Sequence, residues 1–418
     1  MERQYIRSER AHFMCPNMHF GIMVTIKDKP DINKIIASFD VMSKAHPFLR
    51  STIKYESGST NLYYDIGDRS TVDIQERGFT HTRWEDYRKI GEKEWNMLEN
   101  GLLKVFVYTK QEETTMLFVS HHLLGDGRCL LELVNEFADL YVQGKKPVYI
   151  EENLIKGIED LPAKSDLAGV SKYLVKYLNK KWKKEQTLVS YEEYERFSDD
   201  FAKNNPVAHE VMTIEEQECN ALRAYCKKHG ITVNDLLMAK MYVGMNTDKV
   251  IIAADIRAKL KCYNKGACGN YATAMGIVCK DKNKDIISRA KETHKQVQRH
   301  LGSNQKLMLV LSCYLNMDQD LLDAAAITTL GGFKSKAAGI AGGMFGFQKR
   351  DGISLTNLGS LQNDNITEAV FIPPASPAAI QTVGALTVND RLQLCSSYYE
   401  AAISSEKVKS QLKALGHL

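Results

Sequence analysis

The stretch that decides the fold is TTMLFVSHHLLGDG, at residues 114–127. Its four consecutive apolar residues, 116–119, predict a buried β-strand. The Gly-Asp-Gly at its end predicts a sharp turn, and the apolar residues that follow recur at helical spacing. Because neighbouring residues of a strand point to opposite faces, we expect one of His121 and His122 to face a cleft and the other to face the interior.

Length and composition are those of a globular protein with two substantial cores. The chain has 418 residues, of which 44% are hydrophobic and 25% charged, and a net charge of +4. This mild charge, with no basic stripe interleaved with aromatic residues, argues against a nucleic-acid partner. Nine cysteines without a C-x-x-C pair or zinc-ligand spacing predict buried thiols in a reducing compartment and no metal site.

The lack of a recognisable targeting signal predicts a cytoplasmic location. The N-terminal segment is charged and has no apolar core, so we expect no signal peptide. The sequence contains no run of about eighteen apolar residues, so we expect no membrane span.

Hydrophobic patterns predict strands and helices on both sides of the central stretch. The predicted strands lie at 18–26, 48–53, 61–75, 101–108, 250–257, 352–359 and 386–399, and the predicted helices at 31–46, 215–228, 283–303, 304–327 and 404–415, with a further helix starting at 232. The strand at 101–108 is expected to form a hairpin with the strand that ends at His121.

Two segments have unusual composition. Residues 156–205 are rich in Lys, Glu and Tyr, which predicts a helical connection on the surface, with the basic run 180–184 as a solvated face. Residues 331–347 are rich in Gly, Ala and Lys but carry no phosphate-binding pattern, so we expect a flexible loop there.

The residues at 121–127 have the order His-His-x-x-x-Asp-Gly. This resembles the HHxxxDG signature of the CoA-dependent acyltransferase superfamily, which includes chloramphenicol acetyltransferase, the condensation domains of peptide synthetases, alcohol acetyltransferases and plant BAHD acyltransferases. All seven positions match. Weaker resemblances lie at 45–50, 229–239, 255–257, 269–271 and 354–359, where His46 is expected to be structural, and Gly101 stands where proline is common in the family.

The resemblance implies an α/β fold with two chloramphenicol acetyltransferase-like lobes, which form a V-shaped cleft with His122 at its centre. The predicted boundaries are 1–165 for the N-terminal lobe, 166–205 for the connection and 206–418 for the C-terminal lobe. No internal sequence repeat is visible, although the two lobes of this superfamily have similar folds.

The resemblance makes His122 the general base and His121 a supporting residue. An imidazole suits this role because it takes up and returns a proton near neutral pH. A thioester is already activated, so no covalent intermediate is required, and the sequence has no G-x-S-x-G elbow. Asp126 has two possible roles. It is either the acid that orients His122 in a triad or, as in the family, the partner of Arg257 in a structural ion pair, which we prefer.

Other site residues follow from the same resemblance. We expect Gly127 to be needed for its φ angle and for close approach of the donor. The oxyanion donor is expected to be Asn357 or the backbone N–H of Gly127, although Asn357 fits a turn equally well. Lys261 and Lys265 lie on a presumed loop and are candidates to bind a CoA phosphate.

These expectations describe an acyltransferase that moves an acyl group from CoA to a hydroxyl or amine. It would hold no tightly bound cofactor, and acyl-CoA would be a co-substrate with its pantetheine in a tunnel between the lobes. The lack of an attached carrier or adenylation domain favours CoA as the donor. The alternatives are a condensation enzyme supplied by a phosphopantetheine carrier protein, and a non-catalytic binding member of the fold. The intact His122 argues against the last.

Overall fold

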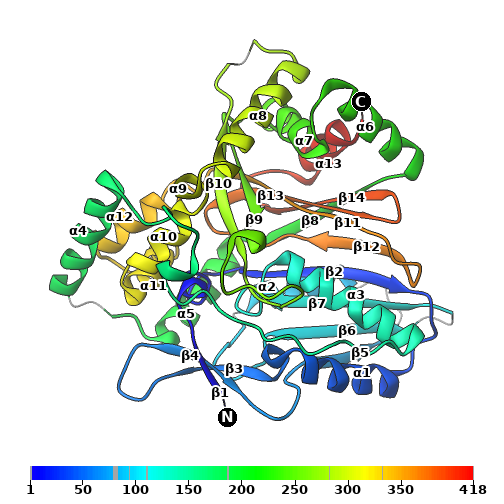
Figure 1. Cartoon of the computed structure of the whole chain (residues 1–418), viewed down its shortest axis with the longest axis horizontal. Coiled ribbons are helices and arrows are strands. Elements are labelled where there is room, and N and C mark those ends of the chain that lie inside the picture. The colour runs from blue at the N-terminus through cyan, green and yellow to red at the C-terminus, as the bar shows by residue number, and fades with distance from the viewer. Residues whose placement is uncertain are drawn as a thin grey trace.

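The computed structural model describes residues 2–78, 83–93, 95–109, 112–185, 188–281, 283–331 and 333–417. Two large β-sheets lie one above the other, each accompanied by helices, and a further group of helices lies at one side (Figure 1). The predicted two-lobed α/β fold is therefore confirmed. In these ranges no helix is long and apolar enough to cross a membrane.

The N-terminal lobe is built on a five-stranded sheet with the strand order β12-β2-β7-β6-β5. Its strands are β2 (His19–Ile26), β5 (Asp73–Arg77), β6 (Leu103–Thr109), β7 (Thr114–His121) and β12 (Ile366–Ile372). Its helices are α1 (Ile32–Ala45), α2 (Arg83–Glu92) and α3 (Gly127–Gln143). A smaller sheet pairs β1 (Glu2–Tyr5), β4 (Leu62–Ile66) and β3 (Ser51–Tyr55). The hairpin predicted between β6 and β7 is present.

The central stretch folds as its residues predict. All eight residues of β7 are buried, which explains its uninterrupted apolar run. Asp126 then caps α3 by accepting a hydrogen bond from the backbone N–H of Cys129, and Gly144 ends the helix in the left-handed conformation.

The C-terminal lobe has a six-stranded sheet with the order β10-β9-β11-β13-β14-β8. Its strands are β8 (Val207–Ile214), β9 (Lys249–Asp255), β10 (Ala272–Val278), β11 (Gly352–Leu361), β13 (Ala379–Val388) and β14 (Arg391–Tyr399). The accompanying helices are α6 (Glu216–His229), α7 (Val233–Gly244), α8 (Ile286–Leu301) and α13 (Ser405–Gly416). Strand β12 lies between β11 and β13 in the sequence, but it pairs with β2 in the sheet of the N-terminal lobe. The C-terminal part of the chain therefore contributes a strand to the N-terminal lobe.

A further group of helices lies at the side of the two sheets (Figure 1). They are α4 (Gly169–Glu185), α5 (Tyr191–Asn204), α9 (Asn304–Leu307), α10 (Leu309–Asn316), α11 (Gln319–Ile327) and α12 (Lys336–Met344). Helices α4, α10, α11 and α12 bury a shared apolar cluster. The expectation of a flexible loop at 331–347 is therefore wrong over α12, because alanines at 337, 338 and 341 pack into this cluster.

Three strand predictions also need correction. The predicted strand 61–75 covers β4 and the start of β5, which are separate strands in different sheets. Residues 386–399 are not one strand, because Asn389 and Asp390 adopt positive φ and form the tight turn between β13 and β14. At the predicted strand 48–53, residues 47–50 form a 3₁₀ turn before β3 begins at Ser51. Pro47 at the start of that turn fixes a φ angle that suits it.

Candidate acyl-transfer site

The two adjacent histidines point to opposite sides, as predicted. His121 is 3% exposed, and its Nδ1 accepts a hydrogen bond of 3.2 Å from the backbone N–H of Leu123. Burial lowers the pKa of His121, and the neighbouring histidines lower it further. His121 is therefore a neutral, structural residue with a fixed tautomer.

His122 instead lines a cavity of about 190 Å³ between the lobes. The other lining residues are mostly small, apolar or hydroxyl-bearing, and come largely from β9, β10, β11 and α10: Ser8, His12, Ile251, Ile252, Ala253, Asn270, Ala272, Thr273, Ala274, Val310, Leu311, Tyr314, Ser354, Thr356, Pro374, Ser376 and Thr382. None of these residues is an Asp, Glu, Lys or Arg. The cavity therefore offers an imidazole in surroundings of low polarity.

Aromatic rings surround the His122 imidazole. Its centroid lies 4.6 Å from that of Phe20 and 4.8 Å from that of His12. Its Nδ1 is buried and has no hydrogen-bond partner among the described residues. Burial lowers the pKa of His122 to about 4, an effect that the backbone of Gly125 only partly opposes. The ring is therefore neutral at pH 7 and available to accept a proton.

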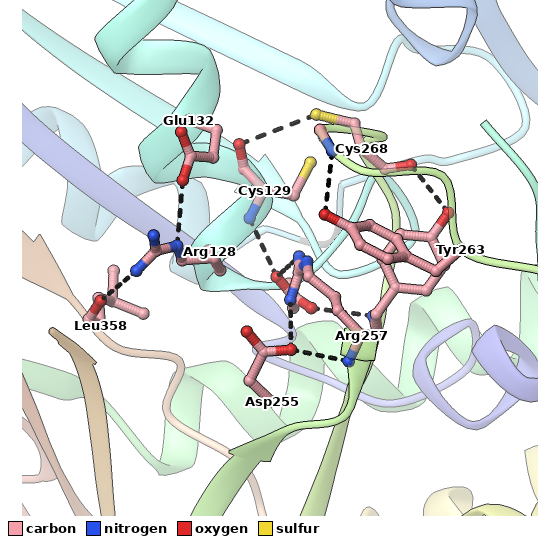
Figure 2. Close-up of polar contacts among 11 residues, drawn as sticks. Arg128, Cys129, Glu132, Asp255, Arg257, Tyr263, Cys268 and Leu358 are labelled. Carbon is pink, nitrogen blue, oxygen red and sulfur yellow. Dashed lines mark hydrogen bonds and ion pairs between the residues drawn. The ribbon is translucent and has the colours of Figure 1, made fainter. Parts of the chain in front are cut away.

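Asp126 ties the turn after His122 to the C-terminal lobe. Its Oδ1 lies 2.7 Å from Nη2 of Arg257, and its Oδ2 accepts a hydrogen bond of 2.9 Å from the backbone N–H of Tyr271. The Arg257 guanidinium also contacts Asp255, as Figure 2 shows. The side chains of Asp126 and Arg257 are only 4% and 11% exposed. The predicted ion pair is confirmed.

The same contacts argue against Asp126 as a triad acid. Its Oδ1 also accepts the capping hydrogen bond from the backbone N–H of Cys129, so each carboxylate oxygen already has a partner. None of these bonds goes to His122, and the backbone N–H of Asp126 donates to the Gly269 carbonyl in the other lobe. Asp126 therefore fixes the turn and the lobe interface.

The backbone of Gly127 shows no need for a glycine φ angle, and its surroundings leave little space for a side chain. It does not have the positive φ that was predicted, because it is the first residue of α3. A Cβ at this position would lie 2.7 Å from a methyl carbon of Leu358 on β11. Next to it, Arg128 donates a hydrogen bond of 3.2 Å to the Leu358 carbonyl (Figure 2). Strand β11 therefore lies close to Gly127, and the close approach of a donor at this residue stays a prediction.

Asn357 does not line the His122 cavity. It is exposed, and its Oδ1 accepts a hydrogen bond of 2.8 Å from the backbone N–H of Gly359. Ser354 and Thr356, on the alternate positions of the same strand, do line the cavity. The oxyanion role of Asn357 stays a prediction, but its observed contact is that of a turn former.

Lys261 and Lys265 are both exposed and lie outside the cavity. Nζ of Lys261 donates a hydrogen bond to the Glu159 carbonyl. The phosphates of CoA lie at the far end of the pantetheine arm from the thioester, so a site for them would be remote from His122. The binding of phosphate by these lysines stays a prediction.

His46 is structural, as predicted. Its two ring nitrogens contact carboxylates of Glu152 at 2.8 Å and Glu136 at 2.6 Å. Burial disfavours the charged ring, but these contacts outweigh burial and raise the pKa of His46 to about 10. His46, Glu152 and Cys268 lie close enough together to suggest a metal site. However, both nitrogens of the protonated ring are donors and have no lone pair for a metal.

Sequence reasoning missed His12 and Ser8. Both lie on the 3₁₀ turn η1 (Ser8–His12) and line the same cavity as His122. Their position depends on contacts with distant parts of the chain. No periodicity in the first fifteen residues connects them to residue 122.

A second cavity, of about 380 Å³, lies on the other side of residues 374–376. Pro374 and Ser376 line the His122 cavity, whereas Ala375 lines the second cavity together with His19, Tyr87 and His209. Both cavities therefore border the same short segment of chain.

Comparisons with solved structures show that other proteins share the fold of this chain. Solved structures of similar fold include the epimerization domain from the third module of tyrocidine synthetase B (14% identity, 98% of this chain and 91% of that one, TM-score 0.61). Others are polyketide synthase associated protein 5 from Mycobacterium tuberculosis (13%, 99% and 96%, 0.60) and trichothecene 15-O-acetyltransferase from Fusarium sporotrichioides (10%, 99% and 93%, 0.63).

A comparison with curated proteins gives no match. The sequence pattern of the Condensation domain family, in contrast, matches residues 17–252, which is more than half of the chain and includes His122 and Asp126. The chain therefore belongs to the Condensation domain family.

Proposed function

We propose that this protein transfers an acyl group from a thioester to a hydroxyl or amine, with His122 as general base. The observation that carries the proposal is the position of His122, whose neutral imidazole lines a cavity between the lobes at the end of β7. A binding protein would have no need of a neutral imidazole in such a place.

The proposed reaction needs no covalent enzyme intermediate. His122 takes the proton from the acceptor O–H or N–H while the acceptor atom bonds to the thioester carbon. The carbon–sulfur bond then breaks, and the proton on His122 passes to the leaving thiolate. Donors for the intermediate oxyanion are available from the hydroxyl-bearing residues of the cavity, among which we propose Ser354 and Thr356.

The imidazolium of the intermediate would be unstable in an empty cavity, because burial already lowers the pKa of His122 to about 4. The oxyanion forms at the same moment and in the same enclosed space. Opposite charges attract strongly where water is scarce, so the oxyanion raises the pKa of His122 when the proton is transferred.

The donor is proposed to be acyl-CoA, with an acyl carrier protein as the alternative. The relatives of similar fold include both an acetyltransferase and domains of peptide synthetases. The two donors share the phosphopantetheine arm, so the uncharged cavity suits either.

The test uses a small thioester that both donors resemble. S-acetyl-N-acetylcysteamine is incubated with the protein and a panel of alcohols and amines, and the released thiol is measured with a chromogenic thiol reagent. We expect acceptor-dependent release that falls at least about 1,000-fold in His122→Ala. The control is His229→Ala, which removes a histidine on α6 outside both cavities.

Parallel reactions with acetyl-CoA and with an acetylated carrier protein identify the donor. Turnover with the carrier protein alone would support the condensation alternative. Thiol release that survives His122→Ala would refute His122 as the base. Tight binding of the thioester without turnover in any reaction would favour the non-catalytic alternative.

A further inference from the structure

We infer that His12 is a positioning residue for His122, which holds the ring of the base by stacking where other enzymes use a hydrogen bond. The inference rests on the proposed function for its catalytic meaning. In catalytic triads, a carboxylate bonded to one imidazole nitrogen sets the orientation of the ring. Here Asp126 is committed elsewhere, no side chain among the described residues bonds to the buried Nδ1 of His122, and the backbone of Gly125 is the polar group that acts on the ring.

Two rings take the place of that hydrogen bond. His12 lies nearly parallel to His122, with an interplanar angle of 21° and centroids 4.8 Å apart. Phe20, on β2, packs against the same imidazole at 51° and 4.6 Å. Aromatic pairs at these distances have preferred geometries, so the two contacts restrict rotation of the His122 ring.

The turn that carries His12 is firmly held. Nε of Arg10 lies 2.9 and 3.0 Å from the carboxylate oxygens of Asp323 on α11, and its Nη2 lies 2.5 Å from one of them. Nη1 of the same guanidinium donates a hydrogen bond of 2.7 Å to the Thr60 carbonyl. The Phe13 ring stacks on Tyr191 at 5.1 Å. Contacts from three other parts of the chain therefore fix the place of His12.

The His12 ring also covers the base from water. Burial lowers the pKa of His12 well below its ordinary value, and His122 lowers it further. Besides His122, the titratable groups that line the cavity are His12 and Tyr314. His121 is the other histidine that interacts electrostatically with His122. Without the His12 side chain, water would reach His122 more easily and the pKa of the base would rise toward 6.5.

The experiment compares His12→Phe, which keeps a ring, with His12→Ala, which removes it. His229→Phe is the matched control, because His229 also packs on an aromatic ring, Tyr225, at 4.6 Å on the distant helix α6. With S-acetyl-N-acetylcysteamine as donor, we expect kcat of His12→Ala to fall by about 10- to 100-fold with little change in KM. His12→Phe should stay within about threefold of the wild-type protein. The acid limb of the pH–rate profile should move to higher pH in His12→Ala alone.

A second measurement needs no substrate. With ¹³C-labelled histidine, the His122 imidazole is titrated by NMR in each variant, and we expect its pKa to be raised in His12→Ala but not in His12→Phe. This result stands even if no thioester is turned over, so failure of the inference is distinguishable from failure of the proposed function. An unchanged titration in His12→Ala would overturn the inference, as would a His12→Phe variant as slow as His12→Ala. If His12→Ala does not fold, a tenfold loss of kcat in a folded His12→Phe would overturn it.

Discussion

The ion pair between Asp126 and Arg257 offers the sharpest test of how the site is held in place. Asp126→Asn keeps the size of the side chain and one acceptor oxygen, which can still accept the capping hydrogen bond from the backbone N–H of Cys129. Its amide nitrogen is a donor and cannot accept the second hydrogen bond, from the backbone N–H of Tyr271. Asp126→Asn also removes the negative charge that faces the Arg257 guanidinium at 2.7 Å. The substitution therefore removes the charge and the bond to Tyr271 but keeps the helix cap.

The expected loss of stability follows from burial. Removing one member of a buried ion pair costs about 3–5 kcal/mol, because the other charge stays buried without compensation. Arg257 retains a contact with Asp255, whose side chain is 56% exposed, so we expect the lower end, about 3 kcal/mol. With an unfolding entropy of about 2 cal/mol/K per residue, this corresponds to about 3 °C in Tm for a chain of 418 residues.

Asp126→Ala should cost about 1 kcal/mol more, since it also removes the helix cap. Urea denaturation of Asp126→Asn, Arg257→Gln and the double variant forms a double-mutant cycle, in which we expect a coupling free energy of about 1–3 kcal/mol. Asp255→Asn is the control and should change stability by less than about 0.5 kcal/mol. If the effects of the two single substitutions on the free energy of unfolding are additive, Asp126 and Arg257 are not coupled, and their ion pair does not stabilise the lobe interface.

Three further predictions concern other parts of the molecule. Arg10→Gln leaves the Asp323 carboxylate buried without its cation, so urea denaturation should show a loss of about 3–5 kcal/mol; a change below about 1 kcal/mol would contradict this. The pKa of His46 is about 10 in the folded protein and about 6.5 when unfolded. The stability that His46→Gln removes should thus be full below pH 6.5 and disappear as the pH rises through 10, whereas a pH-independent difference would refute the charged pair. Asn357→Ala should leave kcat within about threefold, because this residue points out of the cavity, and a loss of about 100-fold would restore its oxyanion role.

The parts of the site that sequence could predict are those that local pattern determines. The strand, the turn and the helix of residues 114–143 depend on an apolar run, a Gly-Asp-Gly turn and helical spacing, all within one short stretch. The opposite directions of His121 and His122 follow from strand geometry alone. The pairing of Asp126 with Arg257 is a long-range contact, and only the family resemblance pointed to it.

Sequence could not predict features that depend on distant contacts. Strand β12 pairs with a strand more than 300 residues earlier in the chain, and no local signal names its partner. Helix α12 is rich in Gly, which resembles a loop, yet its alanines are buried by α4 and α11. His12 reaches the site because Arg10 binds Asp323, a contact that spans 313 residues. In each case tertiary packing overrides the local preference.

The Asp126 carboxylate binds Arg257 at the lobe interface, and this contact determines which charges lie near His122. Carboxylates on both ring nitrogens hold an imidazole protonated at neutral pH, as Glu136 and Glu152 do for His46. Such a ring could not take a proton from the acceptor. With the carboxylate bound to Arg257 and no Asp, Glu, Lys or Arg among the described residues that line the cavity, His122 is neutral at pH 7. In the proposed reaction an imidazolium and an oxyanion would form together in this cavity, and their attraction would be strongest in the transition state, where it would lower the barrier.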